Sequence, residues 1–223
     1  MKRISGKYFA LFIVFALCLS LMPSAFASET DSGTCGDNLT WSLSDTGILT
    51  ISGTGKMEEY SEKAAAPWEV YKPFVLGVKI EAGVTDISDF AFAECSALVS
   101  VTIPEGLESI GAFAFFNCDS LTELITGTGV KSIGDAAFFS CDSLTGISLP
   151  AGVESIGNVA FSDCVGLTGA AIPVSVTAIG IDVFSGCTAL KDIYYSGTQE
   201  QWNAIKIDEH NETLKSTAMH FAG

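Results

Sequence analysis

The sequence predicts an α/β solenoid, a coiled chain with a parallel β-sheet on one face and short helical turns on the other. Three observations lead to this prediction. From Val84 the chain repeats every 23 residues, five times over, and a fixed period in the twenties is typical of a solenoid. Large apolar residues recur at the same positions of every copy. Each copy also holds one short stretch of alternating apolar and polar residues, which is the pattern of a β-strand.

Residues 1–27 have the features of a secretory signal peptide and are not expected to join the fold. Lys2, Arg3 and Lys7 precede an apolar run over residues 9–21, and a small-residue Ala-Phe-Ala sequence ends at position 27. We therefore expect cleavage before Ser28 and a secreted, extracellular protein that is associated with the cell surface if something retains it. No second long apolar stretch follows, so the remaining chain is expected to have no membrane span.

The charge balance argues against two classes of partner. The full chain carries a net charge of −15, and without residues 1–27 it has 8 lysines against 26 acidic residues, a net charge of −18. Arg3 is the only arginine. Because binding to phosphates depends on Lys and Arg, this balance argues against nucleic acid and against anionic membrane surfaces as partners. The acidity itself is typical of a solvated surface rather than of a cation-binding function.

Residues 28–83 are predicted to form an N-terminal β cap and the first strand of the sheet. Leu39, Trp41 and Leu43 alternate with polar residues, residues 44–47 have turn composition, and the apolar residues Ile48, Leu49 and Ile51 follow. This pattern predicts a β-hairpin. A loop through Trp68 then leads into the first strand.

Residues 84–198 form the five repeats, and their invariant columns predict the core. The apolar columns are Ile87, Ile110, Ile133, Ile156 and Ile179; Phe92, Phe115, Phe138, Phe161 and Phe184; and Leu98, Leu121, Leu144, Leu167 and Leu190. Identical large residues at one period indicate side chains that stack in a continuous interior spine. Each buried Phe ring contributes about 150–250 Å² of apolar area.

The alternating stretches predict one continuous parallel sheet along the solenoid axis. Its strands are centred on Val78, Val101, Leu124, Ile147, Ala170 and Ile193. Prolines follow several of these strands, at positions where the backbone no longer has to donate an N–H hydrogen bond to a neighbouring strand. Glycine follows the Ile column in four copies and is expected to permit a tight corner before the turn. Thr126 departs from the pattern, because an apolar residue should end the strand there.

Residues 199–223 are predicted to form a helical C-terminal cap. Thr198 and Gln201 have the spacing of a capping box for a short helix that carries Trp202 and Ile205. A terminal unit with a polar outer face prevents end-to-end stacking of solenoids.

The 23-residue pattern I-G-x-x-A-F-x-x-C-x-x-L-x-x-V-x-I-P resembles the BspA-like leucine-rich repeats of bacterial secreted and cell-surface proteins. The stretches CGDNLTWSLSDTGILTISGTGKM and YYSGTQEQWNAIKI resemble the N-terminal and C-terminal caps of such proteins. The resemblance implies a leucine-rich-repeat coil that mediates adhesion or protein binding.

One cysteine of each repeat falls in a column of its own, with Cys95, Cys118, Cys141, Cys164 and Cys187 as its members. A ladder of buried free thiols is the favoured interpretation, since parallel Cβ vectors fit disulfide geometry poorly. Disulfides stay an alternative because the chain is expected to be secreted. A metal site is disfavoured because no histidine accompanies the column.

The sequence indicates no catalytic, cofactor or metal residues, and we predict that the protein is not an enzyme. The two histidines, His210 and His220, both lie in the C-terminal cap beside Asp208, Glu209 and Glu212. A solvated cap turn explains this group better than a metal site does. No nucleophile–histidine–acid set can be assembled outside the cap.

Two surfaces are candidates for binding a protein partner. On the strand face, Glu123 and Tyr194 are the most usable side chains, because two glycines occupy its middle. On the turn side, Phe116 and Phe139 occupy one column of adjacent copies, with Phe113 and Phe90 nearby. If exposed, these rings would touch and form an apolar patch. The alternative is that they pack under the turns as ordinary core.

These observations lead to three hypotheses about function. The first is a secreted, non-enzymatic adhesion or protein-binding solenoid, whose partner is a host or bacterial surface protein. The second is a structural spacer in a surface layer without a specific partner. The third and weakest is a secreted hydrolase that uses the C-terminal cap.

Overall fold

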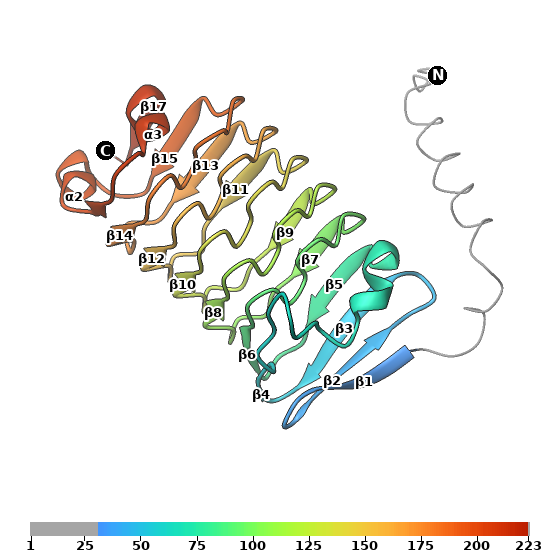
Figure 1. Cartoon of the computed structure of the whole chain (residues 1–223). Helices are drawn as coiled ribbons and strands as arrows, with labels where there is room; N and C mark the ends of the chain where they lie inside the picture. The colour runs from blue at the N-terminus through green and yellow to red at the C-terminus, as the bar shows by residue number, and fades with distance from the viewer. Residues whose placement is uncertain (1–30, 223) are drawn as a thin grey trace, which may run out of the picture.

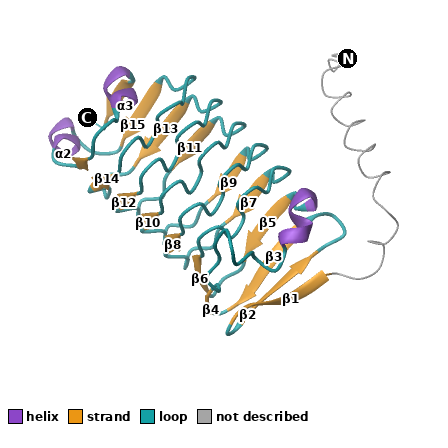
Figure 2. Cartoon of the chain, in the orientation of Figure 1, coloured by secondary structure: helices purple, strands orange, loops and turns teal. Residues whose placement is uncertain are grey.

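The computed structural model describes residues 31–222, and the expected signal peptide lies outside the described residues. The coils stack side by side along one axis, from the strands of the N-terminal cap to the C-terminal cap (Figure 1). Strands and turns make up the repeats, and the helices lie near the two ends (Figure 2).

An antiparallel meander covers the N-terminal end of the solenoid. It consists of β1 (Asp31–Gly36), β2 (Leu39–Leu43) and β3 (Ile48–Gly53). The β2–β3 hairpin was expected, whereas β1 was not, because its sequence DSGTCG has no large apolar residue. β3 then pairs in parallel with β5 (Gly77–Ile80). The antiparallel strands of the cap and the first parallel strands therefore belong to one sheet. Between β3 and β5 lie β4 (Gly55–Lys56) and the 3-10 helix η2 (Glu69–Phe74).

The first strand before the repeats and the repeats themselves contribute the parallel strands that the alternating pattern predicts. They are β5, β7 (Ser100–Thr102), β9 (Glu123–Ile125), β11 (Gly146–Ser148), β13 (Gly169–Ile172) and β15 (Asp192–Tyr195). The expectation of one continuous sheet is wrong. A six-stranded sheet ends at β9 and a four-stranded sheet begins at β11, and no ladder joins these two strands within residues 31–222.

The departure at Thr126 explains where the sheet divides. Ile103 and Leu149 occupy the equivalent position in the neighbouring coils and are buried, whereas Thr126 is only half-buried. Ile125 points to solvent and is 52% exposed. Because the inward position carries a hydroxyl and the outward one a large apolar side chain, this strand packs poorly. A cavity of about 30 Å³ lies at the division and is lined by Leu124, Thr126 and Ile147, among others.

A second parallel sheet, which the sequence did not predict, joins the coils along another edge. It contains β4, β6 (Val84–Ile87), β8 (Ser109–Ile110), β10 (Ser132–Ile133), β12 (Ser155–Ile156), β14 (Ala178–Ile179) and β16 (Lys206–Ile207). β8 pairs with β10 in register, so this sheet stays intact where the other is divided. This second sheet therefore joins the coil before the division directly to the coil after it.

The predicted Phe column forms the interior spine. Phe92, Phe115, Phe138, Phe161 and Phe184 are buried, and successive ring centroids lie 5.3, 5.2, 5.3 and 5.7 Å apart in stacked orientation. Trp68 of the cap extends the stack at 5.3 Å from Phe92. Its indole N–H donates to the carbonyl of Ala91 at 2.7 Å, which satisfies the polar atom of this buried ring.

The turn side consists of consecutive hydrogen-bonded turns rather than of continuous helices. In the first coil Ala91, Ala93 and Cys95 each donate to the carbonyl three residues earlier. Two positions of each coil interrupt any longer helix, because their backbone is left-handed. They are Phe90 and Glu94 in the first coil, with φ of 56° and 62°.

The glycines after the Ile column allow neighbouring coils to approach each other closely. A Cβ on Gly134 would lie 2.5 Å from the backbone nitrogen of Ala112, and one on Gly157 would lie 2.6 Å from that of Asp135. Neither glycine has a positive φ. Glycine is therefore needed at these positions because the neighbouring coil leaves no space for a Cβ atom. We had expected instead that the backbone conformation of the corner would require glycine.

The C-terminal cap contains α2 (Gln199–Asn203), α3 (Glu212–Ser216) and β17 (Ala218–Phe221). The expected capping box of Thr198 and Gln201 is present at α2. Asn211 is buried, and its amide lies between two backbone groups of the last coil. Its oxygen accepts from the N–H of Val183 at 3.0 Å, and its nitrogen donates to the carbonyl of Gly180 at 2.7 Å. The Asn211 side chain thereby replaces the hydrogen bonds that a further coil would provide.

Candidate functional site

Four phenylalanine side chains gather on the turn side of the first three coils. We call Phe90, Phe113, Phe116 and Phe139 the aromatic cluster. Ring centroids lie 4.7 Å apart between Phe90 and Phe113, 5.7 Å between Phe113 and Phe116, and 5.3 Å between Phe116 and Phe139. All four are half-buried, whereas the rings of the interior spine are fully buried. The cluster therefore combines packing against the turns with a surface open to solvent.

The repeat geometry places these rings. Phe90 and Phe113 occupy the first left-handed position of their coils, with φ of 56° in both. Phe116 donates its backbone N–H to the carbonyl of Phe113 at 3.2 Å, so their side chains lie on one turn. Phe139 occupies the column of Phe116 in the next coil. The predicted contact of the Phe116 and Phe139 rings is present, with an interplanar angle of 17°.

The strand-face candidates do not come together. Glu123 lies on β9 and Tyr194 on β15, on opposite sides of the division in the sheet. Glu123 is exposed. Tyr194 is 51% exposed, and its ring stacks on that of His220 with centroids 4.6 Å apart. His220 in turn lies 2.7 Å from a carboxylate oxygen of Asp192.

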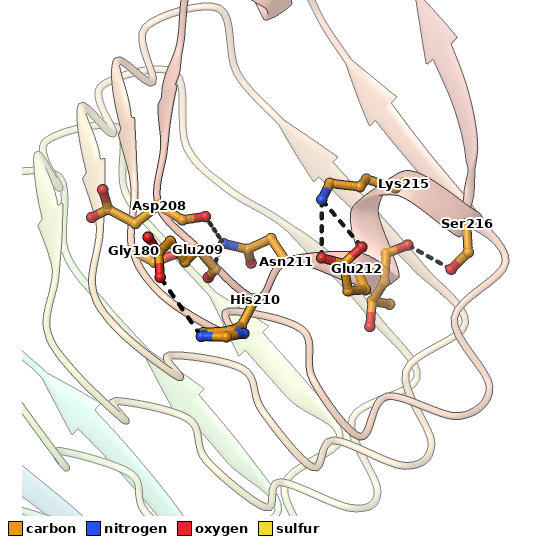
Figure 3. Close-up of polar contacts among 9 residues, drawn as sticks. Gly180, Asp208, Glu209, His210, Asn211, Glu212, Lys215 and Ser216 are labelled. Carbon is orange, nitrogen blue, oxygen red and sulfur yellow. Dashed lines mark hydrogen bonds and ion pairs between the residues drawn. The ribbon is translucent and has the colours of Figure 1, made fainter.

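The polar residues of the C-terminal cap form local pairs rather than a convergent site (Figure 3). Lys215 donates to the Glu212 carboxylate at 2.9 Å, and the His210 ring lies 3.8 Å from the Glu209 carboxylate. Within residues 31–222, no three or more His, Cys, Asp or Glu side chains lie close enough together to hold a metal ion.

The cysteine column is buried, and its thiols are free, as is that of Cys35 in the N-terminal cap. The thiols make a repeated hydrogen bond to the backbone of the preceding coil. Those of Cys118 and Cys141 donate to the carbonyls of Phe92 and Phe115, both at 3.3 Å. Burial raises the pKa of the Cys95 thiol to about 12, so this side chain stays protonated and inert near neutral pH.

The chain belongs to the BspA-type leucine-rich repeat family. The family model described as "BspA type Leucine rich repeat region" matches residues 74–218 in six copies. Five full 23-residue repeats occupy residues 84–198 of this stretch. The search of curated proteins gave no match.

Solved structures of bacterial leucine-rich repeat proteins have the same fold. A leucine-rich repeat protein from Eubacterium ventriosum is 28% identical with a TM-score of 0.70, over 76% of this chain and 45% of the other. A leucine-rich cell surface protein from Faecalibacterium prausnitzii is 34% identical with a TM-score of 0.60, over 84% and 47%. A leucine-rich repeat protein from T. pallidum is 26% identical with a TM-score of 0.55, over 72% and 70%. This chain matches about half the length of the first two.

Within the described residues, none of the helices is both long and apolar enough for a membrane crossing.

Proposed function

We propose that the protein is a secreted, non-enzymatic leucine-rich repeat module that binds a protein on a host or bacterial surface. The aromatic cluster is the observation that carries this proposal. Four half-buried rings form one contiguous apolar feature, and patches of this kind are typical of protein interaction sites. The family and the leader-like residues 1–27 support a place outside the cell, and the similar Faecalibacterium protein is named as a cell surface protein.

The contact surface in this proposal is centred on Phe113, Phe116 and Phe139. Covering about 100 Å² of their apolar area would contribute about 2.5 kcal/mol, at about 25 cal/mol per Å² and before association costs. The rings already pack against one another, so little side-chain entropy is lost when a partner covers them. A partner on the strand face would instead contact Glu123 and Tyr194, which lie on separate sheets.

The experiment compares two double variants against a captured partner. The protein is first used as bait for extracellular matrix and bacterial envelope fractions, and the captured partner is purified and titrated. We expect Phe116→Ser with Phe139→Ser to weaken binding at least tenfold and to keep the circular dichroism spectrum. Glu123→Ala with Tyr194→Ala is the matched control and is expected to keep full affinity.

Three outcomes would count against the proposal. Loss of binding in the strand-face variant alone moves the contact to the other side of the solenoid. Failure to capture any partner from these fractions favours the structural spacer. If the aromatic variant unfolds, Phe139→Ser alone is used, and full affinity of this folded variant removes the cluster from the interface.

A further inference from the structure

A pocket of about 260 Å³ opens at the end of the aromatic cluster nearest the N-terminal cap. Its lining comes from two parts of the chain that are distant in sequence. The cap loop contributes Tyr60 and Glu62, and the turns of the first two coils contribute Phe90, Glu94, Phe113 and Phe116. At about 30 Å³ per water molecule, the pocket holds the volume of roughly nine waters. It therefore has room for one long side chain, but not for a strand or a helix.

One wall of the pocket is aromatic. The Phe90 and Phe113 rings stack at 4.7 Å with an interplanar angle of 9°, and the Phe116 ring is tilted by 60° against Phe113. Tyr60 packs edge-on against Trp68 at 5.7 Å, which anchors the cap side of the pocket to the spine. The faces of such rings carry a negative quadrupole, which attracts a cation within about 6 Å of the ring centre.

The rim of the pocket is acidic and incompletely neutralised. Three carboxylates line it, those of Glu62, Glu69 and Glu94, together with one base, Lys72. Lys72 already pairs with Glu69 at 2.6 Å. Neither Glu62 nor Glu94 takes part in an ion pair within residues 31–222, and both are exposed. A positive charge that entered the pocket would therefore meet two carboxylates with no competing partner.

Two phenylalanines of the aromatic wall have a backbone conformation that is unfavourable for this residue type. Phe90 and Phe113 have left-handed backbones, which cost roughly 1–2 kcal/mol per residue for side chains other than Gly, Asn or Asp. The equivalent position of the last coil carries Asp182, which tolerates this conformation better. The backbone therefore gives no reason for two aromatic rings here. Their stack offsets part of the cost, at about 0.5–1.5 kcal/mol for an aromatic pair.

We propose that this pocket binds the side chain of a surface arginine of the partner protein. Its planar guanidinium would lie on the face of the Phe90 ring that does not stack on Phe113, with its N–H groups directed to Glu62 and Glu94. Arginine fits better than lysine, because it stacks on aromatic faces and donates to two carboxylates at once. The carboxylates of Glu62 and Glu94 at the rim are complementary to a basic partner surface. This inference rests on the proposed function and defines the chemistry of the partner.

The test uses synthetic peptides, because it does not require the natural partner. Blocked Gly-Leu-Arg-Leu-Gly is titrated into the isotopically labelled protein and followed by NMR. The same peptide with citrulline in place of arginine keeps the shape and removes the charge. We expect the arginine peptide to shift the amide signals of Glu62, Phe90, Glu94 and Phe113. We expect the citrulline peptide to bind at least tenfold more weakly.

Variants of the pocket provide the second arm. Glu62→Gln with Glu94→Gln should weaken binding of the arginine peptide about tenfold, while the circular dichroism spectrum stays unchanged. Glu154→Gln with Glu200→Gln makes the same change in net charge at exposed positions outside the pocket and should leave binding unchanged. An equal loss in both variants would show a long-range effect of net charge and would overturn the proposal, as would equal binding of the citrulline peptide.

The two proposals fail in different ways. If the arginine peptide does not bind but the Phe116→Ser, Phe139→Ser variant loses the captured partner, only the arginine pocket is refuted. If the peptide binds at Glu62 and Glu94 while that variant keeps full affinity for the partner, the pocket stands and the contact surface of the proposed function is refuted.

Discussion

Replacing Phe138 and Phe139 one at a time by alanine tests which of these two adjacent residues belongs to the core. Phe138 is 0% exposed, and its ring stacks between Phe115 at 5.2 Å and Phe161 at 5.3 Å. Phe138→Ala therefore removes a fully buried ring and leaves a cavity, and it should lower the free energy of unfolding by about 3–5 kcal/mol. Phe139 is half-buried and stacks on one ring only, so Phe139→Ala should cost about 1 kcal/mol.

The assay is urea unfolding followed by tryptophan fluorescence and by circular dichroism. Trp68 stacks on one end of the spine and Trp202 lies in the C-terminal cap, so fluorescence reports on both ends of the solenoid. Coincident transitions from the two probes are needed before free energies are compared, because repeat proteins can unfold in stages. A loss in Phe139→Ala as large as that in Phe138→Ala would refute the assignment of Phe139 to the surface.

Further predictions concern the thiols, the division of the sheet and the histidines. The buried cysteines should react with a thiol reagent only after denaturation, and any ladder pair linked by a disulfide in the unreduced protein would contradict this. Burial raises the pKa of Cys95 to about 12 from an ordinary value of 9.0, so thiols ionise first in the unfolded chain. Stability should accordingly fall as pH rises above about 9, and an unchanged urea midpoint between pH 7.5 and pH 10 would refute this. Thr126→Val should raise the free energy of unfolding by about 1 kcal/mol, because a methyl group replaces a hydroxyl in an apolar column, and a lower urea midpoint would contradict it. His210→Ala with His220→Ala should leave every measured activity intact, and a hydrolytic activity that this double variant loses would overturn the non-enzymatic assignment.

The sequence predicts those parts of the fold that repeat with large apolar side chains. The Phe spine and the strand centres follow from the 23-residue period, since each column has one physical environment. The second sheet was missed because strands such as β8 and β10 contain two residues each, which is too short for alternation to be visible. The left-handed positions were missed because they carry residues as different as Phe113 and Ala136.

The candidate site was predictable only where it lies within the repeats. The contact of Phe116 with Phe139 follows from their shared column in adjacent coils. The pocket beside the cluster does not, because Tyr60 and Glu62 come from a loop without periodicity. Only the folded cap brings that loop over the first coil. Thr126 was recognisable as a departure, but its consequence for the sheet depends on how both neighbouring coils pack.

Hydroxyl-radical footprinting of the protein, free and bound to its captured partner, tests most directly whether the aromatic cluster is the contact surface. This measurement reports the solvent exposure of individual side chains, and aromatic residues on both faces can be compared in one experiment. We expect binding to protect Phe113, Phe116 and Phe139 from oxidation and to leave Tyr194 and Ile125 as reactive as in the free protein. Protection of Tyr194 and Ile125, with the three phenylalanines unchanged, would contradict this expectation.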